Sequence, residues 1–389
     1  MMSMVAAESS VGRVILAPDK FKGSLSAAEA VARLAAGLRT SVPGIAVASV
    51  PVADGGEGTV DAVVAAGFRR LRAFVPGPTG RPVAAGFAVR GETAVIESAA
   101  ACGLAKLPGG EKAPLTATSY GVGSLIGAAI DAGCTRIVLG LGGSACTDGG
   151  AGLVQALGAE LTDADGDPLR HGGAALASIA ELDIAPLLAR IKGIDITVAC
   201  DVDNPLLGAN GAAAVYGPQK GASPSDVRLL DDALAAWSAA VARAIGTDEY
   251  ATYPGVGAAG GIGFAALALL GARLRPGIEL MLEGAGFADM VRGSRLVITG
   301  EGSLDAQSLR GKAPAGVARV ANALGVPVIV VSGICDLSAE QIREAGFSAA
   351  YCLTDLDDDV GRCIAHAGPL LEVLAERIGR AHLTNGARR

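Results

Sequence analysis

Five short segments of the sequence combine glycine with acidic, basic or hydroxyl side chains directly after an apolar run. They cover residues 19–24, 54–59, 140–144, 200–204 and 299–303. Ligands of open parallel sheets bind outside the carboxyl ends of the strands. Five polar, glycine-containing strand ends exceed what folding alone requires, so we expect a binding site to be built from them.

The segment Gly142-Gly143-Ser144 lies between an apolar strand and a predicted helix. This arrangement is typical of a phosphate-binding turn, in which backbone N–H groups favour an anion. The alternative is that the glycines only allow close helix–strand packing. Asp201 and Asp203 are separated by one residue in an extended segment, so both carboxylates point to one side. That spacing suits Mg²⁺ or a base for a hydroxyl group, and the alternative is a simple turn before Pro205.

Three further groups have both a chemical and a structural interpretation. Lys22 precedes a predicted helix, where a ligand anion or plain solvent exposure would explain a cation. The Asp54-Gly55-Gly56 segment could be only a tight turn, because Asp-Gly is common turn chemistry. Glu301 and Asp305 with the following Lys312 suit a bound metal–nucleotide complex, unless they form a solvated loop.

Other patterns fail in their details. The three histidines lie far in sequence from these segments, and Ser144 has neither a G-x-S-x-G setting nor a histidine partner. Residues 255–260 match G-x-G-x-x-G but follow a poor strand, and residues 311–312 lack the rest of a Walker A loop. Carboxylates, glycine loops and lysines remain, and these suit phosphoryl transfer, which depends on positioning and charge neutralisation.

Composition excludes several other classes of protein. With 51% hydrophobic and 18% charged residues the chain has a large core and is not generally disordered. A net charge of −7 without a Lys/Arg stripe argues against a nucleic-acid partner. The charge-free runs at 113–130 and 250–272 are interrupted by proline, so no membrane span is expected. Seven scattered cysteines and an N-terminus unlike a secretory signal predict a soluble, cytoplasmic protein.

The order of elements predicts an α/β fold with two domains. Apolar runs and helical periodicity alternate up to residue 66 and again from residue 295, which is typical of a parallel sheet. Three short strands near residues 70–97 look antiparallel. We therefore expect a Rossmann-like parallel-sheet domain from residues 1–74 plus 288–389, interrupted by a mixed α/β domain at 75–287. Predicted helices cover residues 27–38, 60–66, 121–132, 151–157, 226–244, 263–274, 314–324, 339–345 and 360–378.

At these loops the sequence resembles the bacterial glycerate kinase family of the glyoxylate and glucarate pathways, the glycerate 2-kinases. The matching segments span almost the whole chain in order, at residues 17–26, 51–59, 118–123, 140–152, 199–205, 216–222, 257–263 and 299–312. One segment departs from the family pattern, because this chain has Ala145-Cys146-Thr147-Asp148 where the family usually has Ala-Thr-Asn-Asp. The change puts a contact of the amide at position 147 in doubt.

The resemblance implies ATP- and Mg²⁺-dependent phosphorylation of D-glycerate, with 2-phosphoglycerate and ADP as products. It also implies two α/β domains with the active site in the cleft between them. Small molecules are then the expected partners, with no nucleic acid and no membrane, and a homo-oligomer stays open.

The resemblance also suggests roles for the residues of the loops. The first candidate for the base that orients the substrate hydroxyl is Asp201, with Asp54 second and Lys22 as a further catalytic group. Candidates for binding glycerate, whose carboxylate we assign to Lys22 and nearby N–H groups, are Asp19, Lys22, Gly23, Ser24, Gly55, Gly56 and Glu57. Candidates for binding ATP are Gly142, Gly143, Ser144, Asp148 and Lys312. Candidates for binding Mg²⁺ are Asp203, Glu301 and Asp305.

Two other functions compete with a kinase at this point. A hydroxyacid- or acyl-binding protein without catalysis, or an inactive kinase, would not need carboxylates at every loop end. An NAD-dependent oxidoreductase of hydroxy acids would also use glycine loops, but it predicts binding of a dinucleotide instead of Mg²⁺-dependent binding of ATP.

Overall fold

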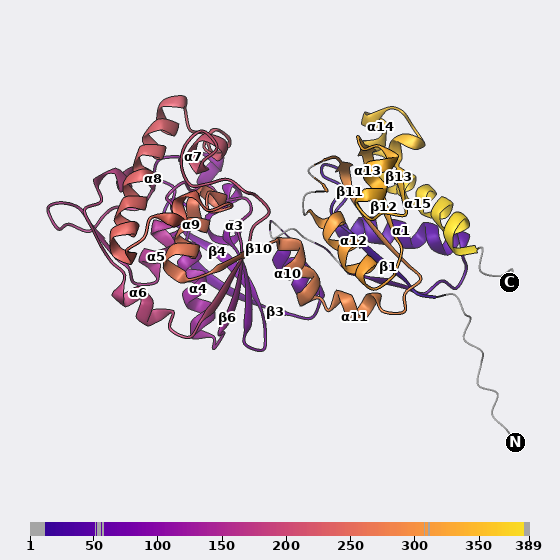
Figure 1. Cartoon of the computed structure of the whole chain (residues 1–389), viewed down its shortest axis with the longest axis horizontal. Coiled ribbons are helices and arrows are strands. Elements are labelled where there is room, and N and C mark those ends of the chain that lie inside the picture. The colour runs from indigo at the N-terminus through magenta and orange to yellow at the C-terminus, as the bar shows by residue number, and fades with distance from the viewer. Residues whose placement is uncertain are drawn as a thin grey trace, which may run out of the picture. The chain divides into compact units, whose positions relative to one another are not determined.

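The computed structural model describes residues 12–50, 52, 56, 58–306, 308, 309 and 312–384. Its contacts divide the chain into two compact units. The terminal unit combines Met1–Val52 with Met281–Arg389, and the inserted unit consists of Ala53–Leu280. Each unit has its own main sheet and its own hydrophobic core, and their elements are labelled in Figure 1.

The described part of the terminal unit contains a sheet of five parallel strands in the order β13-β12-β11-β1-β2. The strands are β1 (Val14–Pro18), β2 (Val47–Ser49), β11 (Leu296–Leu304), β12 (Val328–Cys335) and β13 (Ala349–Cys352). All residues of β1 are buried, as expected for a central strand of a parallel sheet. The chain adds β2 on one side of β1 and the later strands on the other. This change of direction creates a switch point between β1 and β11, where open sheets bind ligands.

Helices of the terminal unit pack closely around this sheet. They are α1 (Ala27–Ser41), α11 (Phe287–Val291), α12 (Ala313–Ala323), α13 (Ala339–Glu344), α14 (Val360–Ala365) and α15 (Ala367–Ile378). Ser26 and Glu29 form a capping box at the start of α1. Helices α1 and α15 lie side by side, with a Cβ on Gly37 reaching within 2.1 Å of the Glu372 carbonyl oxygen. The single helix predicted over 360–378 is wrong, because it is broken at His366, whose φ of −118° is not helical.

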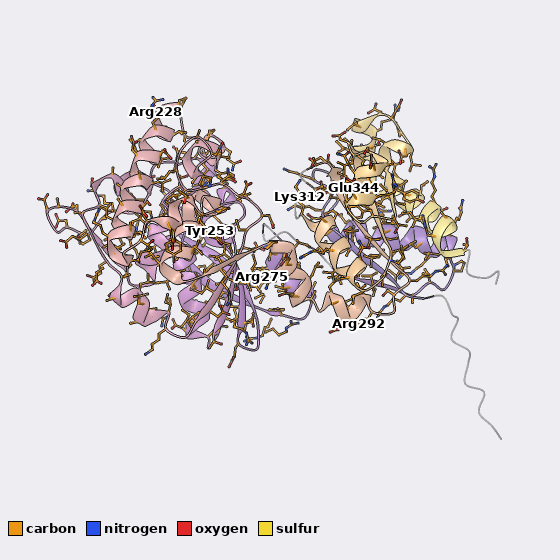
Figure 2. The ribbon with its side chains drawn as sticks, in the orientation of Figure 1. Arg228, Tyr253, Arg275, Arg292, Lys312 and Glu344 are labelled. Atoms are coloured by element: carbon orange, nitrogen blue, oxygen red, sulfur yellow. The ribbon has the colours of Figure 1, made fainter. Side chains whose placement is uncertain are left out.

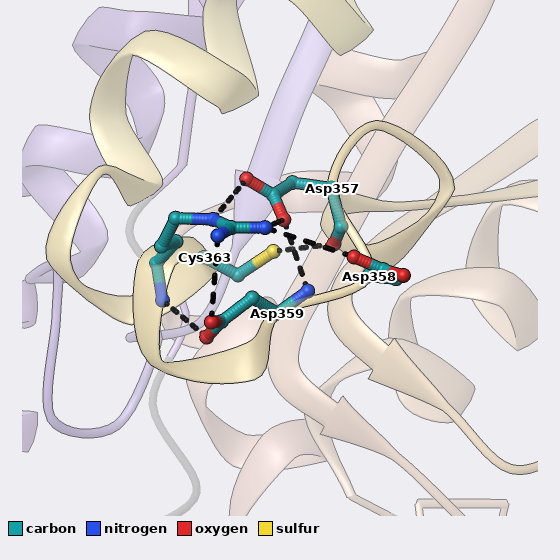
Figure 3. A network of polar contacts seen from close by, with 5 residues as sticks. Asp357, Asp358, Asp359 and Cys363 are labelled. Carbon is teal, nitrogen blue, oxygen red and sulfur yellow. Dashed lines mark hydrogen bonds and ion pairs between the residues drawn. The ribbon is translucent and has the colours of Figure 1, made fainter.

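The turn before α14 is fixed by an arginine between aspartates (Figure 3). The Arg362 guanidinium donates to both carboxylate oxygens of Asp357, at 2.7 and 2.8 Å, and lies 3.7 and 3.6 Å from Asp358 and Asp359. The Cys363 thiol donates to the Asp357 carbonyl oxygen at 3.1 Å. The hydrogen bonds from Arg362 lower the pKa of Asp357 to about 2.

The described residues of the inserted unit form a mixed six-stranded sheet in the order β10-β9-β6-β5-β4-β3. Its strands are β3 (Arg69–Pro76), β4 (Pro82–Arg90), β5 (Thr93–Glu97), β6 (Arg136–Gly140), β9 (Asp195–Ala199) and β10 (Arg273–Arg275). The predicted antiparallel arrangement of β3, β4 and β5 is confirmed, and the pairs from β5 to β10 are parallel. The expected α/β class, with one parallel sheet and one mixed sheet, is therefore confirmed.

Helices of the inserted unit connect these strands, and a separate hairpin pairs β7 (Glu160–Thr162) with β8 (Glu181–Asp183). The helices are α2 (Thr59–Ala65), α3 (Ser98–Cys102), α4 (Tyr120–Asp131), α5 (Ala151–Ala156), α6 (Ala185–Arg190), α7 (Ala212–Tyr216), α8 (Pro224–Ile245) and α9 (Ala258–Leu270), while α10 (Gly277–Gly284) crosses the boundary between the units. The predicted helix over 263–274 is wrong in its last part, because α9 ends at Leu270 and β10 follows.

The contacts divide the chain after Val52 and after Leu280, whereas the sequence suggested boundaries at 74/75 and 287/288. The first difference arises because α2 packs on β3, β4 and β5, which places residues 59–74 with the inserted unit. Where separable domains begin and end in this chain stays a prediction.

Among the described residues, no helix combines the length and apolar character that crossing a membrane requires.

Candidate active site

A cavity of about 400 Å³ opens in the inserted unit at the carboxyl ends of β6 and β9. Its lining includes the loop that follows β6 at residues 141–144, the loop that follows β9 at residues 200–202, and side chains of Tyr216 and Lys220. Two of the five segments selected from the sequence thus meet at one cavity, as the position of ligand sites in parallel sheets predicts.

The glycine loop after β6 presents backbone N–H groups beside this cavity. Gly143 has a positive φ of 74°, and a Cβ on Gly142 would lie 2.6 Å from the Cα of Gly56, so this close approach of two loops requires glycine. Within the described residues, the N–H groups of Gly142, Gly143 and Ser144 have no hydrogen-bond acceptor. Consecutive free N–H groups of this kind form an anion-binding concavity.

Lys220 is a lining residue that the sequence analysis missed. It ends the short turn Pro218–Lys220 between α7 and α8, and only 2% of its surface is exposed. Its Nζ donates to the Ser144 Oγ at 3.2 Å and to the Cys146 carbonyl oxygen. Burial lowers the pKa of the Lys220 ammonium. The only signal in the sequence was its place in the family-like segment 216–222, because a lysine beside Gly221 otherwise suggests a surface turn.

Asp201 lies at the same cavity, and its Oδ1 accepts a hydrogen bond of 2.9 Å from the Gly277 N–H. Asp203 is exposed in the same segment. Cys200 lies in the sequence between β9 and these carboxylates. Burial raises the pKa of its thiol to about 11, so the thiol stays protonated at neutral pH. The cavity therefore offers no reactive thiolate at Cys200. Asp201 is the candidate in this cavity for a carboxylate that accepts a proton.

Asp148 does not lie where the sequence suggested. It is fully buried, and its carboxylate accepts hydrogen bonds from the Ser119 N–H at 2.7 Å and hydroxyl at 2.9 Å, with three more donors at 3.2–3.3 Å. A direct contact of this carboxylate with ATP is incompatible with such burial. Asp148 instead ties the glycine loop to the start of α4 and thereby positions the loop.

A left-handed turn supports the same loop from α9. Ala259, Gly260 and Gly261 have φ values of 54°, 72° and 92°, and Ala259 is the one non-glycine residue among those described with positive φ. The Gly149 N–H donates to the Gly260 carbonyl oxygen at 2.9 Å, and a Cβ on Gly260 would lie 2.1 Å from the Cys146 carbonyl oxygen. The strained turn therefore allows α9 to approach the loop closely. Near it, the buried Thr147 hydroxyl has no hydrogen-bond partner among the described residues.

In the terminal unit, the loop after β1 meets the carboxyl-terminal half of β11 at the switch point of the parallel sheet. The Asp19 N–H donates to the Gly300 carbonyl oxygen at 2.8 Å. A Cβ on Gly302 would lie 3.0 Å from the backbone nitrogen of Lys22. Residues 21–24 form a tight turn with Gly23 at φ 83°, which leaves Lys22 exposed. The Ser24 N–H donates to the Phe21 carbonyl oxygen at 2.9 Å. In contrast to the prediction, this N–H is therefore not available to a substrate carboxylate.

Carboxylates and a lysine gather at the end of β11. Lys312, labelled in Figure 2, is the N-cap residue before α12, and its Nζ lies 3.9 Å from the Asp305 Oδ1. Burial raises the pKa of Glu301, whose Oε1 is buried without a hydrogen-bond partner among the described residues. Such an unpaired carboxylate oxygen fits a cation ligand. No group of three or more His, Cys, Asp or Glu side chains in the described part of the chain is arranged to hold a metal ion.

The predicted site residues thus fall into two groups. The terminal unit holds Asp19, Lys22, Gly23, Ser24, Glu301, Asp305 and Lys312, and the inserted unit holds Gly56, Gly142, Gly143, Ser144, Asp148, Asp201 and Asp203. Three candidates, Asp54, Gly55 and Glu57, lie outside the described residues. Several of these residues lie together within each unit, while the Ser24 N–H and the Asp148 carboxylate are taken up by other hydrogen bonds.

Known proteins match this chain over most of its length. The model of the glycerate kinase family matches residues 14–383. The chain is 42% identical over 369 residues to the glycerate kinase of Bacillus subtilis strain 168, across 94% of this chain and 96% of that protein. It is 45% identical over 343 residues to the glycerate 2-kinase of Escherichia coli K12, across 87% of this chain and 90% of that protein.

A solved structure resembles the whole chain as well. A crystal structure named as a candidate glycerate kinase 2 from Salmonella typhimurium LT2 matches with a TM-score of 0.81 and 41% sequence identity, over 95% of this chain and 98% of that chain. The resemblance noticed in the loop sequences is confirmed, and the chain belongs to the glycerate kinase family, whose members are phosphotransferases.

Proposed function

We propose that the protein transfers the γ-phosphoryl group of ATP to D-glycerate, giving 2-phospho-D-glycerate and ADP. The observation that carries the proposal is the cavity of the inserted unit, whose lining includes both Asp201 and the residues Gly142, Gly143 and Ser144, whose N–H groups have no acceptor among the described residues. The N–H groups suit phosphate oxygens, and the carboxylate suits a hydroxyl proton. Membership of the glycerate kinase family supports the choice of D-glycerate.

The bond changes follow from these roles. The C2 hydroxyl oxygen of glycerate attacks the γ-phosphorus while the bond from that phosphorus to the bridging oxygen of ADP breaks. Asp201 accepts the hydroxyl proton as the new P–O bond forms. Lys22 and the N–H of Gly23 are our candidates for the glycerate carboxylate, since both are exposed at the switch point of the terminal unit. Asp19, Gly55, Gly56 and Glu57 remain candidates for binding glycerate, and Asp54 remains the alternative base.

The residues present also fit a divalent cation. Glu301 offers a buried oxygen without a partner among the described residues, and Asp305 lies near it, while Asp203 remains a further candidate in the other unit. Mg²⁺ bound by these oxygens would neutralise charge on the phosphates and thereby favour transfer. Lys312 is our candidate for adding positive charge near a nucleotide phosphate.

The experiment is a coupled assay of ADP release with ATP, Mg²⁺ and one acid at a time. D-glycerate, L-glycerate, glycolate and lactate are compared, and ³¹P NMR of the product assigns the phosphorylated hydroxyl. We expect turnover with D-glycerate only, lost on addition of EDTA, and the 2-phospho product. Release of ADP with none of the acids would overturn the proposal, and a 3-phospho product would overturn its regiochemistry.

Asp201→Asn tests the proposed base. We expect kcat to fall by about 100-fold with an unchanged midpoint of thermal unfolding, because the amide cannot accept the proton. Asp232→Asn is the matched control, since Asp232 is exposed on α8 away from the cavity lining. A kcat for Asp201→Asn close to that of the control would show that another group accepts the proton.

A further inference from the structure

The inserted unit contains a buried positive charge, and the described residues place no negative partner close to it. Lys220 is 2% exposed, and among the described residues its Nζ forms hydrogen bonds but no ion pair with a carboxylate. Asp148, also fully buried, acts on the ammonium only through space, and its own oxygens are taken up by other donors. Burying an ammonium without a counter-charge is unfavourable, so a lysine in such a place suggests a missing anion.

The surroundings of Lys220 indicate where that anion would bind. An ammonium has three N–H donors, and two are directed to the Ser144 Oγ and to the Cys146 carbonyl oxygen. Lys220 lines the cavity, as do Gly142, Gly143 and Ser144, whose N–H groups have no acceptor in the described part of the chain. A charged donor and several neutral donors therefore face one cavity of about 400 Å³.

We propose that Lys220 is a phosphate-binding residue, whose ammonium holds an oxygen of the ATP polyphosphate against the N–H groups of residues 142–144. This inference rests on the proposed function. Phosphate is favoured over the glycerate carboxylate because its terminal oxygens can accept from the ammonium and from several N–H groups together, and charge-assisted bonds of this kind are strong. The bond to Ser144 at the same time holds the loop in the shape that presents its N–H groups.

A purely structural role is the competing explanation. Lys220 could serve only to connect its turn with the Cys146 carbonyl oxygen and the Ser144 hydroxyl. In that case, loss of the charge would lower the stability of the inserted unit but leave the affinity of folded protein for ATP unchanged. The two roles therefore predict different affinities of folded Lys220→Met for ATP. A measurement of stability alone does not distinguish them.

The test compares Lys220→Met with Lys192→Met by titration calorimetry with ATP and with inorganic tripolyphosphate. Methionine keeps the length of the side chain and removes its charge, and Lys192 is an exposed lysine of the same unit. We expect Lys220→Met to bind both ligands about 10- to 100-fold more weakly, because one charge-assisted hydrogen bond is lost. Lys192→Met should bind as wild type does, and emission from Trp237, which is buried in the inserted unit, checks folding.

A measurement on the wild-type protein covers the case in which Lys220→Met does not fold. The buried ammonium of Lys220 should give a slowly exchanging signal in ¹⁵N-lysine NMR, since solvent cannot reach it freely. ATP and tripolyphosphate should shift that signal, and D-glycerate alone should not. No shift with either phosphate, or an unchanged ATP affinity of folded Lys220→Met, would overturn the assignment. A raised KM for D-glycerate with unchanged ATP affinity would assign Lys220 to the substrate carboxylate instead.

These outcomes separate the two proposals. Phosphate binding that depends on Lys220, without release of ADP in the presence of D-glycerate, would sink the proposed function and leave the phosphate site. Phosphorylation of D-glycerate by a Lys220→Met variant with wild-type ATP affinity would overturn the phosphate-binding role of Lys220 and support the proposed function.

Discussion

Replacing Ala259 with glycine should stabilise the inserted unit, although alanine-to-glycine changes usually do the opposite. Ala259 has φ 54°, in the left-handed region where a Cβ is unfavourable. Its neighbours Gly260 and Gly261 already have positive φ, so glycine can adopt the conformation of this turn without strain. The change therefore releases strain that the native backbone now holds.

The magnitude follows from three opposing contributions. A left-handed backbone costs an alanine about 1–2 kcal/mol. Glycine makes the unfolded chain more flexible, which costs about 0.4–1 kcal/mol. Ala259 is only half-buried, so loss of its methyl group costs about half of the ~0.8 kcal/mol of a buried methylene. We expect a net gain of about 0.5 kcal/mol in the free energy of unfolding.

The matched control is Ala239→Gly, at an exposed position inside α8. Glycine there should cost about 1 kcal/mol, because the helix gains no relief from strain. Urea unfolding followed by Trp237 emission measures both variants. Trp237 is the one tryptophan of the chain, and its Nε1 donates to the Gly149 carbonyl oxygen next to the turn. If Ala259→Gly lowers the free energy of unfolding as much as the control does, Ala259 is not strained and the argument is wrong.

Two further predictions concern the terminal unit and pH. The native pKa of Asp357 is depressed to about 2 from 3.8, so its pairing with Arg362 should stabilise fully above pH 4 and be lost as the pH falls towards 2. Asp357→Asn should accordingly lower the thermal midpoint more at pH 7 than at pH 2, measured by circular dichroism, and an equally large difference at both pH values would contradict this. Burial raises the pKa of Glu301 above 4.5, so its carboxylate costs stability as the pH rises through that range. Glu301→Gln should raise the midpoint at pH 8, measured without Mg²⁺, while reducing Mg²⁺-dependent turnover; a lower midpoint at pH 8 would refute the desolvation argument.

The strands could be predicted from the sequence because apolar runs mark the buried strands of a parallel sheet whatever their partners are. The runs before Asp19, Gly142 and Asp201 all become strands, and their polar ends lie at carboxyl edges. The two helix errors have local causes. His366 leaves the helical region just before Gly368 and Pro369, a signal that the helical periodicity of residues 360–378 outweighed in the prediction, and Gly271 ends α9 although apolar residues continue beyond it.

The site could be predicted only in part, because burial depends on tertiary contacts. The residues before Asp148, which is fully buried, do not distinguish it from Asp201, which lies at a cavity, since both aspartates follow small residues in a loop after an apolar strand. Lys220 was missed for the same reason. Its turn is polar and contains proline and glycine, yet the chain folds it against the Ser144 loop.

The interruption of the terminal unit also bears on the order in which the protein can fold while it is being made. Strands β1 and β2 leave the ribosome first, but β11, which pairs along the whole of β1, follows only after residues 53–280 have been synthesised. Two short strands and one helix cannot bury enough apolar surface to be stable alone. The inserted unit, whose strands are all contiguous in sequence, can therefore fold first, while the early segment waits for the last part of the chain.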